Sequence, residues 1–197
     1  INRQYGSGGR EIGRRLAERL DVPYYNKELL TMAAEKSGLC QDFIKKSLVD
    51  VPSNKFWYAL ALNPQALMVS SDNSYLTADM AKTALCEAVR HIADQGPCVI
   101  VGRYAGSILR DRDDVMRVFV SCDDEDRVEK IIKRDGLSAK AAASKMKRVD
   151  KERATYADLH FGEDWGKASN YDLCLNSGLI GIEGCVKAIQ QVLELTE

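Results

Sequence analysis

Gln4-Tyr5-Gly6-Ser7-Gly8-Gly9-Arg10-Glu11-Ile12-Gly13 is the stretch that decides the fold of this chain. Its glycines lead directly into a segment in which Ile12, Leu16 and Leu20 recur at helical spacing. Glycine permits positive φ values and close backbone approach, so consecutive N–H groups can converge on an anion, and the following helix adds the positive end of its dipole. The stretch therefore predicts a phosphate-binding loop. A surface turn that only caps a helix is the alternative.

Six consecutive residues are the candidates for holding phosphate: Gly6, Ser7, Gly8, Gly9, Arg10 and Glu11. They do not match the G-x-G-x-x-G pattern, and they lack the Gly-Lys-Ser/Thr ending of the standard phosphate loop. Gly8-Gly9-Arg10 stands in place of that ending, so the lysine that reaches the outer phosphates and the hydroxyl that holds Mg²⁺ are both missing. We expect Arg10 to supply a cation from the first helical turn instead.

The composition is that of one ordinary globular domain, with 45% hydrophobic and 29% charged residues among 197. A net charge of −1 argues against a general nucleic-acid binder, whose affinity comes largely from phosphate neutralisation. No signal-like segment and no apolar run long enough to cross a bilayer occur, so we expect a cytoplasmic protein without membrane contact. Because the chain begins with Ile1, a few residues of the opening strand are expected to precede it.

The six cysteines are predicted to be buried small hydrophobes, because they are scattered singly and no two have the C-x-x-C spacing of a zinc site. They are Cys40, Cys86, Cys98, Cys122, Cys174 and Cys185. With only His91 and His160 in the chain, a histidine-centred triad or a His-rich metal site is not expected.

Short apolar runs alternate with longer helical periods, which predicts an α/β domain with a mainly parallel sheet. The run Cys98-Val99-Ile100-Val101 is continuously apolar, as expected for a central strand covered by helices on both faces. Five strands are predicted, over residues 1–3, 22–25, 98–101, 115–121 and 171–175.

Besides the helix that follows the glycines, four helices have clear sequence signals. Apolar residues at helical spacing predict amphipathic helices over 81–92 and 182–193. Asp123 or Asp124 can cap a third helix that stops at Gly136, and Ser138 can cap a fourth. The fourth helix has few apolar residues, so we expect it to cover a site from outside rather than to fill the core.

The segment 51–74 combines prolines with several large aromatic and aliphatic groups and has no regular pattern. Exposed apolar groups of that size would be a liability. We therefore expect this segment either to close over a ligand or to meet a second copy of the chain in a homo-oligomer.

In an open parallel sheet, ligands bind beyond the carboxyl ends of the strands. Asn26 and Arg103 follow two of the predicted strands and are therefore candidate binding residues. Arg103 is suited to bind a phosphate through two parallel hydrogen bonds. An ion pair with Asp111 or Asp113 is its alternative role.

A basic segment lies between the last two predicted strands and contains Arg134, Arg148 and Arg153. Phosphoryl transfer requires in-line positioning and neutralisation of charge, which arginines on a closing cover can provide. Two other interpretations stay open. The basic run can be a solvated helix face, and Arg153, which shares a helical face with Tyr156 and His160, can line the seam on which the cover rests.

Four separated motifs resemble the cytidylate-kinase-like proteins: residues 1–13, 101–103, 150–156 and 165–176. They occur in the family's order and together span nearly the whole chain. The resemblance implies a single domain over 1–197 with the P-loop NTPase fold of the nucleoside-monophosphate-kinase type. That fold has three layers, a five-stranded mainly parallel sheet, a helical insertion that binds the monophosphate, expected over 27–95, and a basic lid, expected over 134–166.

The resemblance also implies ATP-dependent phosphoryl transfer to a nucleoside monophosphate or similar small phosphorylated substrate, with ATP and Mg²⁺. On this reading Gly6 to Glu11 hold the donor phosphates and Arg103 holds the acceptor. Arg10, together with Arg148 and Arg153 of the lid, would be catalytic.

The chain departs from authentic cytidylate kinases at three positions. Gly9 replaces the loop lysine, and Val101 and Tyr104 replace two aspartates. Losing these groups removes positive charge from the phosphates and an acidic route to Mg²⁺. The candidates to compensate for the lost acid are Glu11, Asp21 and Asp172.

Two functions of another class therefore remain open. The first is a non-catalytic nucleotide-binding protein that serves as a sensor or assembly module on the same fold. The second is an interaction protein whose glycine loop binds only stray anions.

Overall fold

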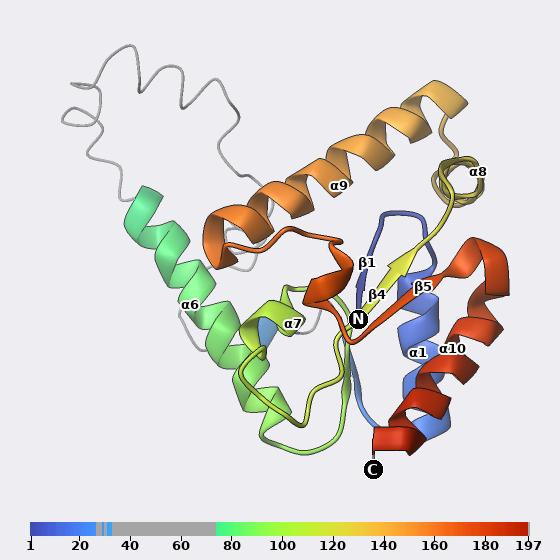
Figure 1. Ribbon diagram of the computed structural model, residues 1–197. Coiled ribbons are helices and arrows are strands. Elements are labelled where there is room, and N and C mark those ends of the chain that lie inside the picture. The colour runs from blue at the N-terminus through green and yellow to red at the C-terminus, as the bar shows by residue number, and fades with distance from the viewer. Residues whose placement is uncertain (27–28, 30, 33–73, 197) are drawn as a thin grey trace, which may run out of the picture.

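A computed structural model describes residues 1–26, 29, 31–32 and 74–196 of the chain (Figure 1). Short strands alternate with helices along these residues. The elements are β1 (Asn2–Arg3), α1 (Gly9–Leu20), β2 (Tyr24–Tyr25), α6 (Ser74–Ala93), β3 (Val99–Ile100), α7 (Ala105–Ile108), β4 (Val118–Ser121), α8 (Asp124–Asp135), α9 (Ala139–Phe161), a 3₁₀ turn (Ala168–Asn170), β5 (Leu173–Asn176) and α10 (Ser177–Thr196).

The five strands all pair in parallel, as predicted, and each is shorter than its predicted range. They form two hydrogen-bonded sheets, one with the order β1-β4-β5 and one with β2-β3. The continuous five-stranded sheet expected from the sequence is therefore wrong. The two sheets are joined by two bonds of Ile1, whose nitrogen donates to the carbonyl of Ile100 at 2.7 Å and whose carbonyl accepts from the amide of Gly102 at 2.9 Å.

The backbone after β3 explains why that pairing does not continue. Gly102, Arg103 and Tyr104 have φ angles of 75°, 59° and 54°. Three successive residues in the left-handed region turn the chain out of the extended conformation. The chain beyond β3 consequently leaves the sheet before it can pair with Asn2 and Arg3.

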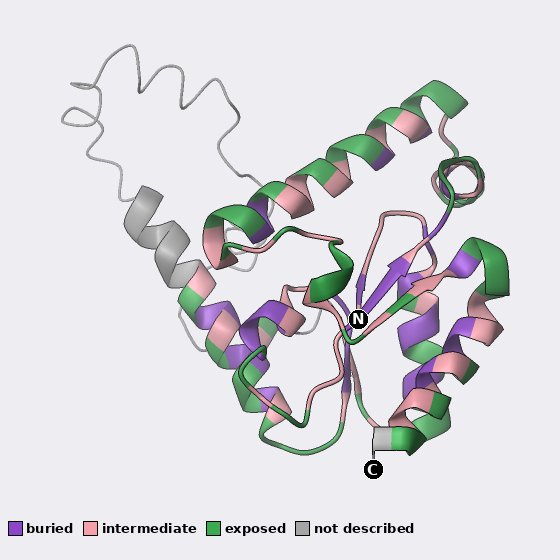
Figure 2. Ribbon diagram, in the orientation of Figure 1, coloured by how far each residue is buried: buried purple, intermediate pink, exposed green. Residues whose placement is uncertain are grey.

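Helices cover both faces of the β3 region, which confirms the prediction made from its continuous apolar run. Val99 and Val101 pack in a cluster with α1 and α10, whereas Ile100 packs in a second cluster with α6 and α7. Figure 1 shows α1 and α10 side by side on one flank and α6 and α7 on the other, and Figure 2 shows purple, buried residues along the strands between them.

A third, smaller cluster lies between α8 and α9 and is separate from the main core. Ile131, Ala142 and Met146 are buried there, and Tyr5 of the glycine loop packs against them. α8 and α9 thus share a core of their own, and the glycine loop contributes a side chain to it.

The predicted ends of α8 and the predicted cap of α9 are confirmed, but the Asp123 side chain makes no capping hydrogen bond at the start of α8. Asp123 precedes α8 and Gly136 follows it with a φ of 65°. The Ser138 hydroxyl accepts a hydrogen bond from the Ala141 amide at 3.3 Å at the start of α9. The predicted helices over 81–92 and 182–193 fall inside α6 and α10.

Other expectations have mixed outcomes. Cys122 and Cys185 are buried as predicted, but Cys174 is exposed because β5 is at the edge of its sheet. Cys40 and nearly all of the 51–74 segment lie outside the described residues, as does much of the expected 27–95 insertion. Among the described helices, none is both long enough and apolar enough for a bilayer span.

Close packing of α1 on β3 gives a stability prediction. A Cβ added at Gly13 would lie 2.3 Å from Cγ2 of Val101. We expect Gly13→Ala to lower the free energy of unfolding by about 1–3 kcal/mol through overpacking, despite the better helix propensity of alanine. Urea unfolding measures the change.

The control is a double-mutant cycle with Val101→Ala, which removes the clashing methyl group. Gly13→Ala should cost less in that background than in the wild type. Equal costs in the two backgrounds would show that the contact with Val101 does not restrict position 13.

Candidate phosphate-binding site

The glycine loop between β1 and α1 has the backbone conformation of an anion cradle. Gly6 and Gly8 have φ angles of 90° and 82°, which side-chain-bearing residues rarely adopt. The Gly8 carbonyl accepts the amides of Glu11 and Ile12 at 2.9 and 3.1 Å and so starts α1. The positive end of the α1 dipole therefore faces the loop.

The loop also offers free donors. Within the described part of the chain, the amides of Gly6, Gly8, Gly9 and Arg10 have no protein acceptor. Such orphan N–H groups at a helix start are the usual donors to phosphate oxygens. This arrangement favours the phosphate loop predicted from the sequence over a plain helix cap.

The Ser7 side chain anchors the loop from inside the protein. It is completely buried, and its hydroxyl donates to the Gln4 carbonyl at 2.9 Å. Its carbonyl accepts the Ser177 hydroxyl at 2.6 Å, which ties the loop to the first residue of α10. Ser7 was predicted to bind phosphate, and its side chain instead fixes the loop conformation.

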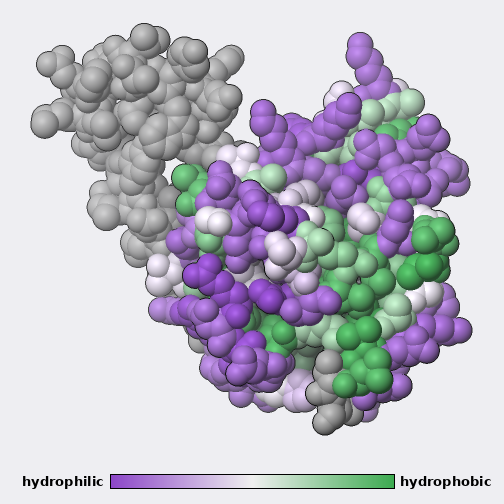
Figure 3. Space-filling model, viewed as in Figure 1, coloured by the Kyte–Doolittle hydropathy of each residue, from purple (hydrophilic) through white to green (hydrophobic). Residues whose placement is uncertain are grey.

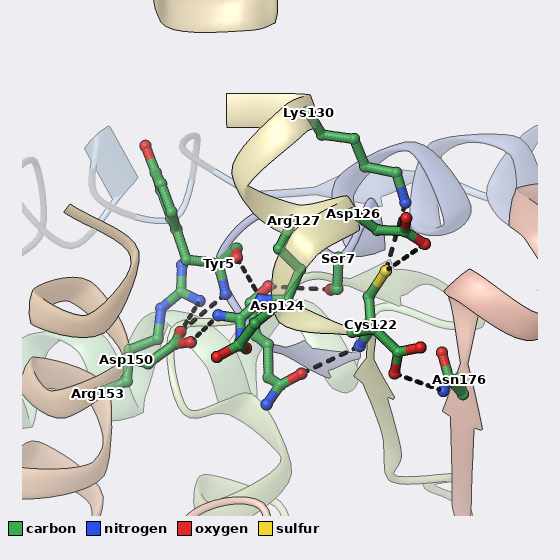
Figure 4. Close-up of polar contacts among 12 residues, drawn as sticks. Tyr5, Ser7, Cys122, Asp124, Asp126, Arg127, Lys130, Asp150, Arg153 and Asn176 are labelled. Carbon is green, nitrogen blue, oxygen red and sulfur yellow. Dashed lines mark hydrogen bonds and ion pairs between the residues drawn. The ribbon is translucent and has the colours of Figure 1, made fainter. Parts of the chain in front are cut away.

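The Asp150 carboxylate joins the loop to both α8 and α9 (Figure 4). It accepts the Tyr5 amide at 2.8 Å and pairs with Arg127 of α8 and, at 3.4 Å, with Arg153 of α9. The Arg127 side chain is only 4% exposed and also donates to the Tyr5 carbonyl at 2.9 Å. A buried cation, a carboxylate and the loop backbone thus form one connected network.

The Tyr5 side chain makes a second connection between the loop and helices α8 and α9. The guanidinium carbon of Arg134 lies 4.8 Å from the ring centroid, and Nζ of Lys145 lies 5.9 Å from it, in the geometry of cation–π contacts. Arg134 also donates to the Tyr5 hydroxyl at 2.6 Å. Asp135 accepts from both cations, which hold the pKa of its carboxyl well below the usual range.

Four arginines gather at the carboxyl ends of β1 and β3: Arg3, Arg10, Arg103 and Arg153. Burial lowers the pKa of Arg3 well below its ordinary value, and the positive charges of the other three lower it further. Burial also lowers the pKa of Arg153, with a contribution from Arg10. In the described residues, no carboxylate lies within ion-pair distance of Arg3 or Arg10. The cluster therefore has an excess of positive charge that suits a polyanion.

Arg103 and Asn26 meet as the sequence suggested. Asn26 is buried at the end of β2, and its carbonyl accepts Nε of Arg103 at 3.2 Å. The alternative partner Asp111 instead lies beside Arg110 at 3.7 Å. Arg103 has a φ of 59°, an unfavourable value for a side-chain-bearing residue, and such strain is common at functional sites.

The α9 helix rests directly on this turn. The Tyr104 and Tyr156 rings stack with their centroids 4.4 Å apart, and Tyr156 is fully buried. Arg153, three residues earlier on α9, donates to the Arg3 carbonyl at 2.7 Å. The sequence left two roles open for Arg153, and it does lie in the seam under α9, with its guanidinium group among the cluster.

The other candidates are not at the cluster. Arg148 is 61% exposed and pairs with Glu152 at 2.5 Å on the outer side of α9. Asp21 caps the far end of α1, and Asp172 pairs with Arg117 before β4, at the amino edge of the sheet. Glu11 is beside the loop but pairs with Arg14 and Arg15, which lower its pKa to about 2.

Sequence reasoning missed Arg3, Tyr5, Arg127 and Asp150. Arg127 and Asp150 are separated from the loop by more than a hundred residues, so no local pattern connects them with it. Tyr5 has no sequence signal of its own beyond its place in the glycine motif. For Arg3 the available signal was its position as the last strand residue before the glycines, since such residues reach the carboxyl edge.

The donors present suit polyphosphate, which needs amides and guanidinium groups. No cluster of three or more His, Cys, Asp or Glu side chains suitable for a metal ion occurs among the described residues. Mg²⁺ is usually held by one or two carboxylates together with substrate phosphates. Of the candidate acids only Glu11 lies beside the loop, and it is paired with Arg14 and Arg15, so Mg²⁺ would be held chiefly through the phosphates. Figure 3 shows hydrophilic side chains gathered over α8 and α9 above this region.

Comparison with known families agrees with the geometry. The model of the cytidylate kinase-like family matches residues 1–179. The chain belongs to the cytidylate kinase-like family. This confirms the family resemblance inferred from the four motifs, and kinases of this kind in general use ATP and Mg²⁺.

Individual relatives are distant. A cytidylate kinase from Pyrococcus horikoshii is 29% identical over 103 residues, which are 52% of each protein, so the chain spans about half the length of this curated relative. A crystal structure of an uncharacterized protein from Eubacterium ventriosum matches with a TM-score of 0.70 and 23% identity, over 98% of this chain and 96% of that one. That likeness shows the shared fold.

The network around Asp150 gives a stability prediction. Asp150→Ala leaves the Tyr5 amide without its acceptor and removes one of the two carboxylates that pair with the buried Arg127, which keeps Asp124 at 2.8 Å. We therefore expect it to cost about 2–3 kcal/mol of unfolding free energy. Glu152→Ala, two residues along the same helix, removes only one pair with the exposed Arg148 and should cost about 1 kcal/mol or less. Chemical denaturation of both variants measures the difference, and similar losses would refute the role given to Asp150.

Asp135 gives a prediction on pH. Its depressed pKa means that its pairs with Arg134 and Lys145 stabilise the fold above the ordinary carboxyl pKa of 3.8, and that this contribution is lost as the pH falls further. Asp135→Asn should therefore lower the melting temperature at pH 7 by an amount that shrinks below about pH 4. Asp158→Asn, on the exposed side of α9, is the matched control. A pH-independent difference would contradict the prediction.

Proposed function

We propose that this protein is an ATP-dependent kinase that transfers a phosphoryl group to a nucleoside monophosphate, with cytidylate as the first candidate acceptor. The proposal rests on one arrangement: four arginines share the carboxyl edge of the parallel strands with loop amides that have no acceptor among the described residues. Membership of the cytidylate kinase-like family supports it. We also propose that the reaction takes place in the cytoplasm.

The reaction asks the protein chiefly for positioning and charge. An oxygen of the acceptor phosphate forms a bond to the γ-phosphorus, and the bond between that phosphorus and the β–γ bridging oxygen breaks, so that the diphosphate of the donor leaves. Negative charge is spread over the transferring group and the leaving oxygen during this exchange. Fixed cations and amides that face these oxygens lower the barrier without reorganising.

The residues have three roles under this proposal. The amides of Gly6, Gly8, Gly9 and Arg10 hold the donor phosphates, and Arg103 holds the acceptor phosphate. Arg153 lies on α9 between these two sides and neutralises the transferring group. Mg²⁺, when bound through the donor phosphates, supplies further neutralisation of their charge.

A second candidate is supported by the loop itself. Gly9 stands where a phosphate loop carries its lysine, which favours a protein that binds nucleotide without transferring phosphate, as a sensor or assembly module. Homo-oligomerisation through residues 51–74 would suit such a module. The two candidates differ in turnover, because only the kinase forms ADP in the presence of an acceptor.

The proposal is tested by a coupled ADP assay with ATP, Mg²⁺ and a panel of nucleoside monophosphates. We expect turnover with at least one acceptor. Arg103→Met should raise the KM for that acceptor at least tenfold through loss of the charge-assisted contact, and Arg110→Met, on an exposed ion pair nearby in sequence, should not change it.

Two outcomes count against the kinase. Nucleotide binding without turnover for every acceptor would leave the non-catalytic module. No turnover together with no nucleotide-induced rise in melting temperature would remove both candidates.

A further inference from the structure

We propose that Arg3, on β1, binds the outer phosphates of the nucleotide in place of the missing loop lysine. The identity of the nucleotide rests on the proposed function. The role of Arg3 as the anion-binding cation at the loop rests on its own contacts.

The stem of Arg3 fills the space beside the loop position that lacks a side chain. A Cβ built on Gly9 would lie 2.6 Å from Cβ, 2.8 Å from Cγ and 3.6 Å from Cδ of Arg3. Two of these distances are too short for real Cβ contacts. Gly9 therefore leaves room for the side chain of Arg3, and a lysine at position 9 and an arginine at position 3 exclude each other.

The guanidinium group of Arg3 extends to the turn after β3. A Cβ built on Gly102 would lie 1.9 Å from Nη1, 2.7 Å from Cζ and 2.9 Å from Nη2 of Arg3. The side chain of Arg3 thus extends from Gly9 in the glycine loop to Gly102 beside Arg103. A cation in that position lies between the donor side and the acceptor side of the site.

The charges around Arg3 indicate that its natural partner is an anion from outside the chain. The positive charges of Arg10, Arg103 and Arg153 each lower the pKa of Arg3. Among the described residues, no carboxylate lies within ion-pair distance of the Arg3 guanidinium. Like charges gathered in this way destabilise a protein unless an anion joins them. A polyphosphate is the anion that can contact several guanidinium groups and the loop amides at once.

The chemistry of arginine is suited to this task, although it differs from that of lysine. The planar guanidinium can donate two parallel hydrogen bonds to phosphate oxygens, whereas an ammonium acts as a compact point charge. An arginine supplied by the strand therefore keeps the positive charge that the loop lysine would give, and it restricts the direction of the hydrogen bonds to phosphate more narrowly.

Binding of tripolyphosphate and of ATP, measured by calorimetry and by the rise in melting temperature, tests the proposal without requiring turnover. Arg3→Met keeps most of the packing stem and should weaken both ligands at least tenfold, and Arg3→Lys should fall between this variant and the wild type. The matched control is Arg90→Met, which removes an exposed arginine from the last turn of α6 before the amino end of β3, and it should bind as the wild type does.

An exchange of the two positions is the sharper test. Gly9→Lys alone should lose stability and affinity because of the clash with Arg3. The double variant Arg3→Gly/Gly9→Lys removes the clash and restores a cation to the loop. Its affinity for tripolyphosphate should exceed that of Arg3→Gly alone by about tenfold or more, since one charge-assisted contact is regained. Circular dichroism checks that each variant is folded.

The outcomes separate this inference from the proposed function. Unchanged tripolyphosphate affinity in Arg3→Met, or no gain in the exchange variant over Arg3→Gly, overturns the role of Arg3 even if the wild type is an active kinase. Loss of affinity in Arg3→Met with recovery in the exchange variant supports the role of Arg3 even if no acceptor is phosphorylated. No binding of tripolyphosphate by the wild type overturns the inference outright.

Discussion

The contact of the Asp150 carboxylate with the Tyr5 amide is the constraint on which the rest of the site depends. It joins the loop after β1 to α8 through Arg127 and to α9 through Arg153. One negative charge thereby neutralises part of a strongly basic region and fixes three elements relative to one another. Because Arg127 is almost fully buried, this network is a structural requirement of the fold as well as a feature of the site.

Once Asp150 is committed to Arg127 and Arg153, the positive charge of Arg3 and Arg10 is not balanced within the described residues. The left-handed backbone at Arg103 and Tyr104 adds conformational strain at the same edge of the strands. Excess charge and strain both cost stability in the absence of ligand. The excess charge and the strain lie at the same edge of the strands as the glycine loop. A bound polyanion would relieve the repulsion among these arginines.

The α/β class, the parallel strands and the helix caps could be predicted because they depend on local patterns. The apolar run at Val99 to Val101 identified a strand buried on both faces, and Ser138 identified the start of α9. The single five-stranded sheet was wrong because the turn at Gly102 ends β3 before it can pair fully with β1, and positive φ values at Arg103 and Tyr104 have no sequence signal. Of the predicted site residues, Arg103 and Arg153 lie in the arginine cluster, whereas Arg148 is exposed and pairs with Glu152 away from it.

The family and the backbone geometry of the glycine loop could be read from the residues alone, because glycine spacing before a helix dictates backbone geometry over a few residues. Only the tertiary structure decided which cations meet that loop. Arg3, Arg127 and Asp150 acquire their partners through packing between segments that are distant in sequence, and the direction of a side chain at a strand end depends on its neighbours. The role of Gly9 likewise depends on three-dimensional packing. The space that a side chain at position 9 would fill is occupied by the side chain of Arg3, six residues earlier in the chain.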